Sequence, residues 1–150
     1  MTELRRVYLD SNVFIAAMEN PGAHSDHAWW IINAVEESQI VGVTSEITLA
    51  EILVKPIELG DRDLAAAYEQ MIVPSAMFEV LQVRREILIG AAQMRARRSS
   101  IRLPDAIHVS TALASRCSHF VSDDRRLHSI DSLKMLGVNP FTLDDILEDQ

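Results

Sequence analysis

The chain has 150 residues, of which 48% are hydrophobic and 24% charged, with five glycines and five prolines. This balance is typical of one folded domain and excludes a disordered or collagen-like chain. The single cysteine, Cys117, excludes an internal disulfide and a cysteine-rich zinc cluster, so we expect a cytoplasmic protein.

The charge is unevenly distributed, although the total is −8. Residues 84–126 contain nine arginines and four acidic residues, a net charge of +5, while the rest of the chain carries −13. The basic segment could bind a polyanion, but solvated arginines on helix faces would explain it equally well. No apolar run approaches the roughly 20 residues of a membrane-spanning helix, and Asp10 and Asn12 interrupt the first one. We therefore expect no membrane segment and no secretion signal.

Strand and helix patterns alternate along the chain. In order, we expect a strand at 5–9, helices at 13–18 and 23–38, a strand at 40–43, helices at 46–54 and 61–72, a strand at 78–83, helices at 84–98 and 105–116, and a strand at 119–122. This alternation predicts an α/β fold, a three-layer α/β/α sandwich with a mainly parallel central sheet, formed as a single domain over residues 1–150.

Capping and proline signals set several of these boundaries. Thr44 and Ser45 offer an N-cap for the third helix, and Pro56 is expected to disrupt its continuation. Pro104 suits the first position of the helix over 105–116.

In the tail, an edge strand is expected near Pro140 and Phe141, because proline cannot donate to a ladder. A short helix capped by Thr142 should follow it.

Four acidic residues stand out from this pattern. Asp10 follows the first strand and Asp124 the fourth, at the sheet edge where parallel strands place a ligand. Glu51 has apolar neighbours on every side, so a metal or an arginine should compensate its charge. Asp105 lies in the first turn of its helix, on a face that we expect to pack inward. Singly, these residues could be caps or turns, but together they would repel one another unless a divalent cation lay among them, and an all-oxygen set favours Mg²⁺ or Mn²⁺.

The segments that carry these acids resemble the four acidic motifs of the PIN-domain ribonucleases, in order and spacing: Tyr8–Val13, Thr48–Glu51, Leu103–His108 and Phe120–Asp124. The resemblance extends from about residue 7 to 147, and the chain's size is similar to that of the VapC toxins of toxin–antitoxin pairs. It implies a PIN-like fold and a Mg²⁺- or Mn²⁺-dependent endoribonuclease that has a cognate antitoxin and forms a homodimer.

By the same resemblance, the catalytic and metal-binding residues are Asp10, Glu51, Asp105 and Asp124, supported by Asn12, Ser122 and Asp123. The last motif reads Ser122-Asp123-Asp124 where the family usually has Thr-Asn-Asp or Thr-Arg-Asp, so either aspartate could face the metal, and we favour Asp124. The arginines that precede Asp105 could hold the RNA backbone by charge without reading its sequence: Arg95, Arg97, Arg98 and Arg102.

Other interpretations remain open. His24 and His27 lie one helical turn apart, but two ligands are too few for a metal site, and His108 is more simply a satisfied helix residue than a catalytic base. Aspartyl-phosphate phosphatases also place an aspartate after their first strand, but they carry a second acid where this chain has Asn12. A PIN-like domain that binds RNA or protein without cleavage is the non-enzymatic alternative.

Overall fold

The computed structural model describes residues 3–124, 126–127, 130 and 132–149. Within them, five strands form one sheet in the order β3-β2-β1-β4-β5, and every neighbouring pair is parallel. The strands are β1 Arg6–Leu9, β2 Val41–Ser45, β3 Phe78–Leu81, β4 His119–Val121 and β5 Lys134–Leu136. The predicted parallel α/β architecture is confirmed.

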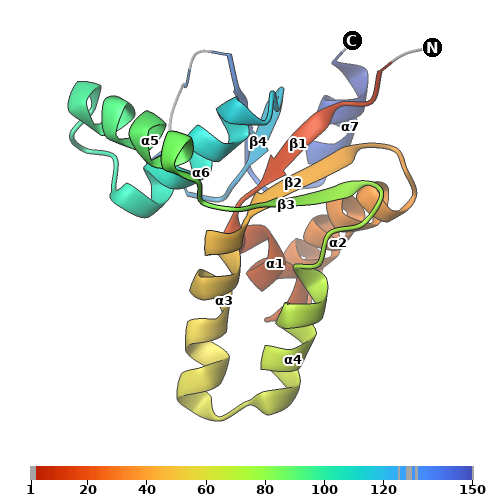
Figure 1. Ribbon diagram of the computed structural model, residues 1–150. Helices are drawn as coiled ribbons and strands as arrows, with labels where there is room; N and C mark the ends of the chain where they lie inside the picture. Colours follow the sequence, from red (N-terminus) through yellow and green to blue (C-terminus); the bar gives the residue numbers. More distant parts are fainter. Residues whose placement is uncertain (1–2, 125, 128–129, 131, 150) are drawn as a thin grey trace.

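The described chain contains seven helices: α1 Ser11–Met18, α2 Ala23–Glu36, α3 Glu46–Leu59, α4 Arg62–Met71, α5 Arg85–Arg97, α6 Leu103–Ala114 and α7 Thr142–Glu148. Helices α5 and α6 lie on one side of the sheet and α2 and α7 on the other, while α3 and α4 extend away from it as a hairpin (Figure 1). None of these helices is long and apolar enough to cross a membrane.

Alternation along β1 divides the core between the two faces. Val7 and Leu9 are buried in the cluster that contains residues of α1, α2 and α7. Tyr8 points the other way and packs with residues of α5 and α6. Successive side chains of a strand alternate between faces, so one central strand contributes to both cores.

The order in which strands are added to the sheet reverses at β1, and this reversal positions the site. β2 pairs with one edge of β1, whereas β4 returns to the other edge and places Val121 opposite Leu9. Ligands of open parallel sheets bind outside the carboxyl ends of the strands at such a switch point. Asp10 and Ser122, the residues that directly follow β1 and β4, therefore meet there.

Pro56 does not end the third helix as predicted. Helix α3 continues to Leu59 and ends at Gly60, whose φ of 67° is left-handed. Pro56 is one of the buried residues of α3, so packing of its ring offsets the backbone hydrogen bond that proline cannot donate. Ser45 caps α3 through a bond from the Ile47 amide, as predicted, but Thr44 remains in β2.

The predicted edge strand near Pro140 and Phe141 is also wrong. These two residues form a turn, and the edge strand is β5, which pairs with β4. Thr142 is the first residue of α7 and not its cap, since its hydroxyl accepts from the Asn139 amide instead.

The other helix and strand boundaries shift by at most two residues. One of these shifts moves Pro104 to the second position of α6, because the helix begins at Leu103.

Candidate active site

Asp10 lies at the junction of β1 and α1, where it is the N-cap of the helix and only 4% exposed. Its Oδ1 accepts the amide hydrogen of Ser11 at 2.8 Å, and its Oδ2 accepts the hydroxyl hydrogen of Ser122 at 2.7 Å. The first bond comes from the helix start and the second from the end of the neighbouring strand. The carboxylate is thus fixed from two sides.

Asn12 and Ser122 link the ends of β1 and β4. Asn12 Nδ2 donates to Ser122 Oγ at 3.1 Å, and its Oδ1 accepts the Asp123 amide at 3.1 Å. Ser122 Oγ also accepts the Asp124 amide at 3.0 Å. These bonds hold the loop after β4 against the start of α1.

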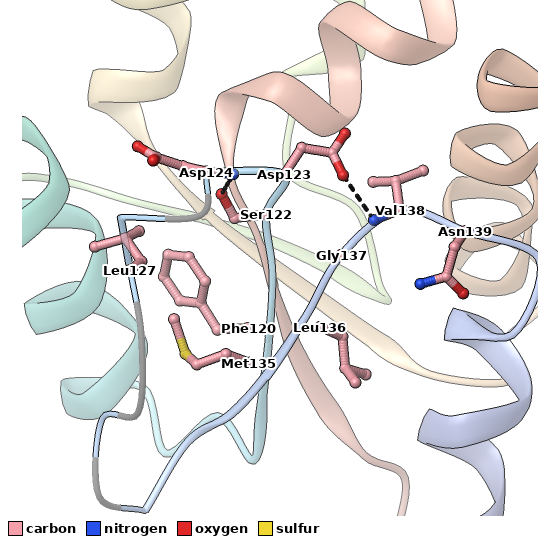
Figure 2. A pocket seen from close by; sticks show the side chains of 10 residues that line it. All are labelled: Phe120, Ser122, Asp123, Asp124, Leu127, Met135, Leu136, Gly137, Val138 and Asn139. Carbon is pink, nitrogen blue, oxygen red and sulfur yellow. Dashed lines mark hydrogen bonds between the residues drawn. The ribbon is translucent and has the colours of Figure 1, made fainter.

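Asp123 and Asp124 point in different directions (Figure 2). Asp123 accepts the Val138 amide at 2.9 Å and pairs with His24 Nε2 at 2.8 Å, so its side chain anchors the loop after β5. Asp124 contributes to the charge around Asp105. Of the two aspartates, Asp124 is thus the one whose charge acts on Asp105.

A cavity of about 540 Å³ opens beside the acids, between the ends of β4 and β5. Ser122 and Asp124 form one wall, and the side chains of Phe120, Leu127 and Met135 form an apolar floor (Figure 2). A group that extends from the acidic cluster could enter this cavity.

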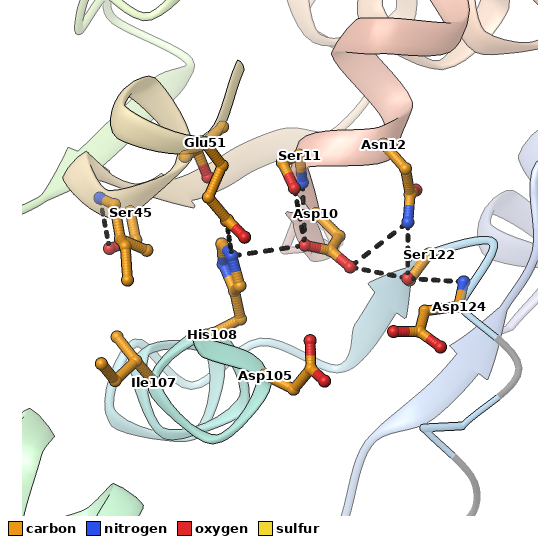
Figure 3. Close-up of polar contacts among 12 residues, drawn as sticks. Asp10, Ser11, Asn12, Ser45, Glu51, Asp105, Ile107, His108, Ser122 and Asp124 are labelled. Atoms are coloured by element: carbon orange, nitrogen blue, oxygen red, sulfur yellow. Dashed lines mark hydrogen bonds and ion pairs between the residues drawn. The ribbon is translucent and has the colours of Figure 1, made fainter. Parts of the chain in front are cut away.

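Asp105 lies in the first turn of α6 and is 8% exposed. Burial raises its pKa above the ordinary value, and the negative charges of Asp124 and Asp10 raise it further. Among the described residues, its nearest cation is Arg102, whose Nε lies 3.6 Å from Asp105 Oδ2, and none of them donates a hydrogen bond to it. Figure 3 shows the carboxyl groups of Asp10, Asp105 and Asp124 in the same region.

Asp124 has a cation of its own in Arg126. The Arg126 guanidinium donates to both carboxylate oxygens, at 3.0 and 2.9 Å, and the Arg126 amide donates at 3.0 Å. These hydrogen bonds hold the pKa of Asp124 below its usual value, although partial burial acts against them. Arg126 is exposed, so an incoming cation could displace it.

Among the described residues, the partner of Glu51 is a histidine and not the arginine that was one of the two compensating groups expected for it. His108 Nε2 forms a hydrogen bond with Glu51 Oε1 and lies 3.4 Å from Asp10 Oδ1. The neighbours also differ from the prediction, since Val54 is 53% exposed and the Glu51 side chain is 33% exposed. The buried face of α3 is formed by Thr48, Ile52 and Pro56.

His108 is the site residue that the sequence interpretation missed. It is 1% exposed, and its Nδ1 lies 2.6 Å from the hydroxyl of Tyr8. Burial alone would lower the pKa of His108, but the hydrogen bond with Glu51 and the charges of Asp10, Glu51 and Asp105 together raise it. The spacing from Asp105 to His108, one helical turn, places the two on one face of α6 but does not reveal the bond with Glu51.

The predicted RNA-binding arginines are grouped between the end of α5 and the start of α6. Arg95, Arg97 and Arg102 are exposed and Arg98 is half-buried. Arg95 Nε donates to the Ile101 carbonyl at 3.1 Å, and Arg102 is the neighbour of Asp105. The group thus leads toward the acids.

His24 and His27 have separate partners among the described residues. His24 pairs with Asp123, while the ring of His27 packs on Trp30 at a centroid distance of 4.8 Å.

The acidic cluster has the chemistry that a divalent cation needs. One ligand atom each from Asp10, Glu51 and His108 lies within 4.8 Å of the other two. Asp105 adds a buried carboxylate that the neighbouring negative charges destabilise in its ionised form. A hard cation would compensate these charges and is preferred by oxygen ligands, so the residues fit Mg²⁺ or Mn²⁺.

Comparison with known proteins identifies the family. The chain superposes on VapBC2 from Rickettsia felis bound to a promoter DNA fragment (TM-score 0.69, 14% identity, 89% of this chain and 99% of that chain). It also superposes on VapC20 from Mycobacterium tuberculosis, described as a sarcin–ricin loop cleaving toxin (0.63, 16%, 85% and 98%), and on FitAcB from Neisseria gonorrhoeae (0.62, 17%, 90% and 98%). Comparison with curated proteins found no match. The family profile of the PIN domain matches residues 7–133, and the chain therefore belongs to the PIN domain family.

Proposed function

We propose that this chain is a metal-dependent endoribonuclease and the toxin of a VapBC-type toxin–antitoxin pair. The observation that carries the proposal is the convergence of Asp10, Glu51, Asp105 and Asp124 at the switch point of a PIN-domain sheet. The structural relatives support it, since VapC20 is described as a sarcin–ricin loop cleaving toxin, another relative as a toxin–antitoxin complex and a third as a member of the VapBC family of toxin–antitoxin systems.

The four carboxylates would hold Mg²⁺ or Mn²⁺, which, when bound, lowers the pKa of a coordinated water and neutralises charge that develops on a phosphodiester. Ser122 and Asn12 keep Asp10 in place through their hydrogen bonds. The arginines of α5 and the following loop hold the RNA backbone beside Asp105. The residues thus have three proposed roles: metal ligands, residues that hold a ligand in place, and residues that contact the RNA backbone.

The experiment that tests the proposal is incubation of the purified chain with mixed cellular RNAs, in Mn²⁺ or in chelator, beside the Asp10→Asn variant. Discrete cleavage fragments should appear with Mn²⁺ and be absent in the other two reactions. RNA that is bound but intact in all three would support a PIN-like domain that binds RNA or protein without cutting. Fragments that persist in chelator would contradict a metal-dependent site.

We also propose the two protein partners that the resemblance implies. An apolar groove of about 490 Å³ between α2 and α4 is lined by Leu9, Trp29, Ile32 and Met71 among others. It could hold the apolar tail of an antitoxin whose cationic side chain enters the acidic cluster.

For a homodimer, the projecting end of α3 offers the exposed side chains of Val54, Ile57 and Leu59. Light scattering of the purified chain tests this assembly, and a monomeric mass at micromolar concentration would contradict it.

A further inference from the structure

His108 lies between two of the carboxylates and a buried tyrosine (Figure 3). Its Nε2 faces Glu51 Oε1 and Asp10 Oδ1, the latter at 3.4 Å, and its Nδ1 faces the Tyr8 hydroxyl at 2.6 Å. Both ring nitrogens therefore have partners, and the two partners differ in chemistry. A carboxylate accepts hydrogen bonds only, whereas a tyrosine hydroxyl can donate or accept.

This difference fixes the position of one proton. Because the ionised carboxylates of Glu51 and Asp10 offer only acceptors, a hydrogen bond to either of them requires a hydrogen on Nε2. A nitrogen that carries a hydrogen has no lone pair for a metal ion. The imidazole thus acts as a donor to carboxylates that we assign to the metal, although its distance alone would also suit a ligand.

The surroundings of the ring hold it in this orientation. Tyr8 contacts His108 edge-on, with ring centroids 5.7 Å apart, and stacks on Phe120 at 4.9 Å. Tyr8, Phe120 and His108 are each at most 1% exposed. A ring this buried cannot touch an RNA chain, so its effect must pass through the carboxylates.

We propose that His108, held by Tyr8, is a positioning residue whose Nε2–H orients the Glu51 carboxylate, and with it Asp10, while the metal ligands remain oxygen atoms. Glu51 needs such a partner because α3 extends away from the sheet and the Glu51 side chain is one-third exposed. The inference rests on the proposed function only in naming the cluster as a metal site.

Calorimetric titration with Mn²⁺, without RNA, tests this role in wild type and three variants. His108→Leu keeps the volume but removes the donor, and should weaken Mn²⁺ binding by roughly 10- to 100-fold, as loss of a residue that orients metal ligands does. His108→Gln restores an N–H near the Nε2 position and should recover most of the affinity. The Mn²⁺ affinity of Tyr8→Phe should lie between those of His108→Leu and His108→Gln, because the His108 donor remains but its ring is less restrained.

Nitrogen-15 spectra of the wild-type histidines give a second measurement that needs no variant. The Nε2 of His108 should carry a hydrogen both without metal and with saturating Mg²⁺. Loss of that hydrogen on Mg²⁺ addition would make His108 a ligand and overturn the proposal, as would wild-type Mn²⁺ affinity in a folded His108→Leu protein. If His108→Leu does not fold, the Gln variant and the spectra decide.

Neither measurement depends on catalysis. A chain that binds Mn²⁺ in this pattern but cleaves no RNA would overturn the nuclease and leave the role of His108 intact.

Discussion

The two halves of the acidic cluster are built differently. Asp10 and Glu51 receive hydrogen bonds from side chains and backbone, among them Ser11, Ser122 and His108. Asp105 receives none from the described residues and is surrounded by the charges of Asp10 and Asp124, which raise its pKa together with burial. Asp10 and Glu51, the organised half, are thus held in place before a cation arrives. Asp105, the strained half, has an unfavourable ionised form until a cation binds.

Local backbone structure explains this difference. Asp10 follows a central strand and caps a helix, so the start of α1 and the adjacent end of β4 both supply donors. Asp105 lies inside the first turn of α6, whose N-cap residue, Arg102, makes no side-chain capping bond. The helix dipole favours a carboxylate there, but by about 0.3–1 kcal/mol, which is little against burial beside two like charges.

The largest expected effect is on cleavage, where the two halves should behave alike. Asp10→Asn and Asp105→Asn should each lower RNA cleavage on the order of 100-fold or more, because each removes a charged metal ligand. Rates with Mn²⁺ on a fixed RNA give the comparison, and circular dichroism checks the fold. Activity retained in both folded variants would refute the assigned site.

Divalent cation should stabilise wild type strongly and act mainly through the strained half. At 100 times its Kd, Mn²⁺ contributes about 2.7 kcal/mol, or roughly 5–10 °C in Tm for a domain of this size. Asp105→Asn should lose most of this shift. Asp26→Asn also removes an acid from the first turn of a helix, but at an exposed position, so this matched control should keep the shift. A Tm that responds to Zn²⁺ but not to Mn²⁺ would count against an oxygen-ligand site.

Without metal, substitutions in the two halves should change the Tm in opposite directions. Because the folded-state pKa of Asp105 is raised, stability falls as pH rises from its ordinary value of 3.8 through the folded value, and the full penalty is present at neutral pH. Asp105→Asn should therefore raise Tm by a few degrees at pH 7.5 in chelator and by less at pH 4. Asp10→Asn should lower Tm, since its amide cannot accept every bond that the carboxylate accepts. Equal shifts at both pH values would show that charge repulsion is not the cause.

Much of this arrangement could be predicted from sequence, because it depends on local signals. Asp10, Asp105 and Asp124 each lie at a strand end or a helix start, and parallel topology brings those ends together. The prediction for Glu51 relied on apolar periodicity, which fails where α3 leaves the sheet and exposes Val54. The prediction that Pro56 disrupts the third helix was wrong for a related reason, because the stabilisation gained by burying its ring depends on tertiary packing.

His108 and β5 could not be identified by local signals. The hydrogen bond between His108 and Glu51 joins residues 57 positions apart, and nothing near either residue marks the other. β5 has three residues, too few to display alternation, and is defined by its pairing with β4. The proline signal at Pro140, from which an edge strand was predicted, lies in a turn.

An antitoxin contact should depend on the organised half, with a smaller effect. If a cationic side chain enters the cluster, Glu51→Gln should weaken binding of a co-purified antitoxin by about tenfold, because it removes one charge while the amide oxygen can still accept from His108. Calorimetry at fixed salt without metal measures this, and Glu58→Gln, an exposed position of α3, is the control. Equal affinities in wild type and Glu51→Gln would place the antitoxin elsewhere.

The smallest expected effect concerns the arginines that lead toward Asp105. Arg97 is exposed in the last turn of α5, so Arg97→Ala should remove one phosphate contact without disturbing the core. In the Asp10→Asn background, where RNA stays intact, this change should weaken RNA binding a few-fold and reduce the slope of log K against log salt by about 0.7 for a single strand. Arg62→Ala on α4, equally exposed, should change neither quantity. If both variants lower the slope alike, RNA follows the overall charge of the surface and the arginines beside the strained half have no special part in holding it.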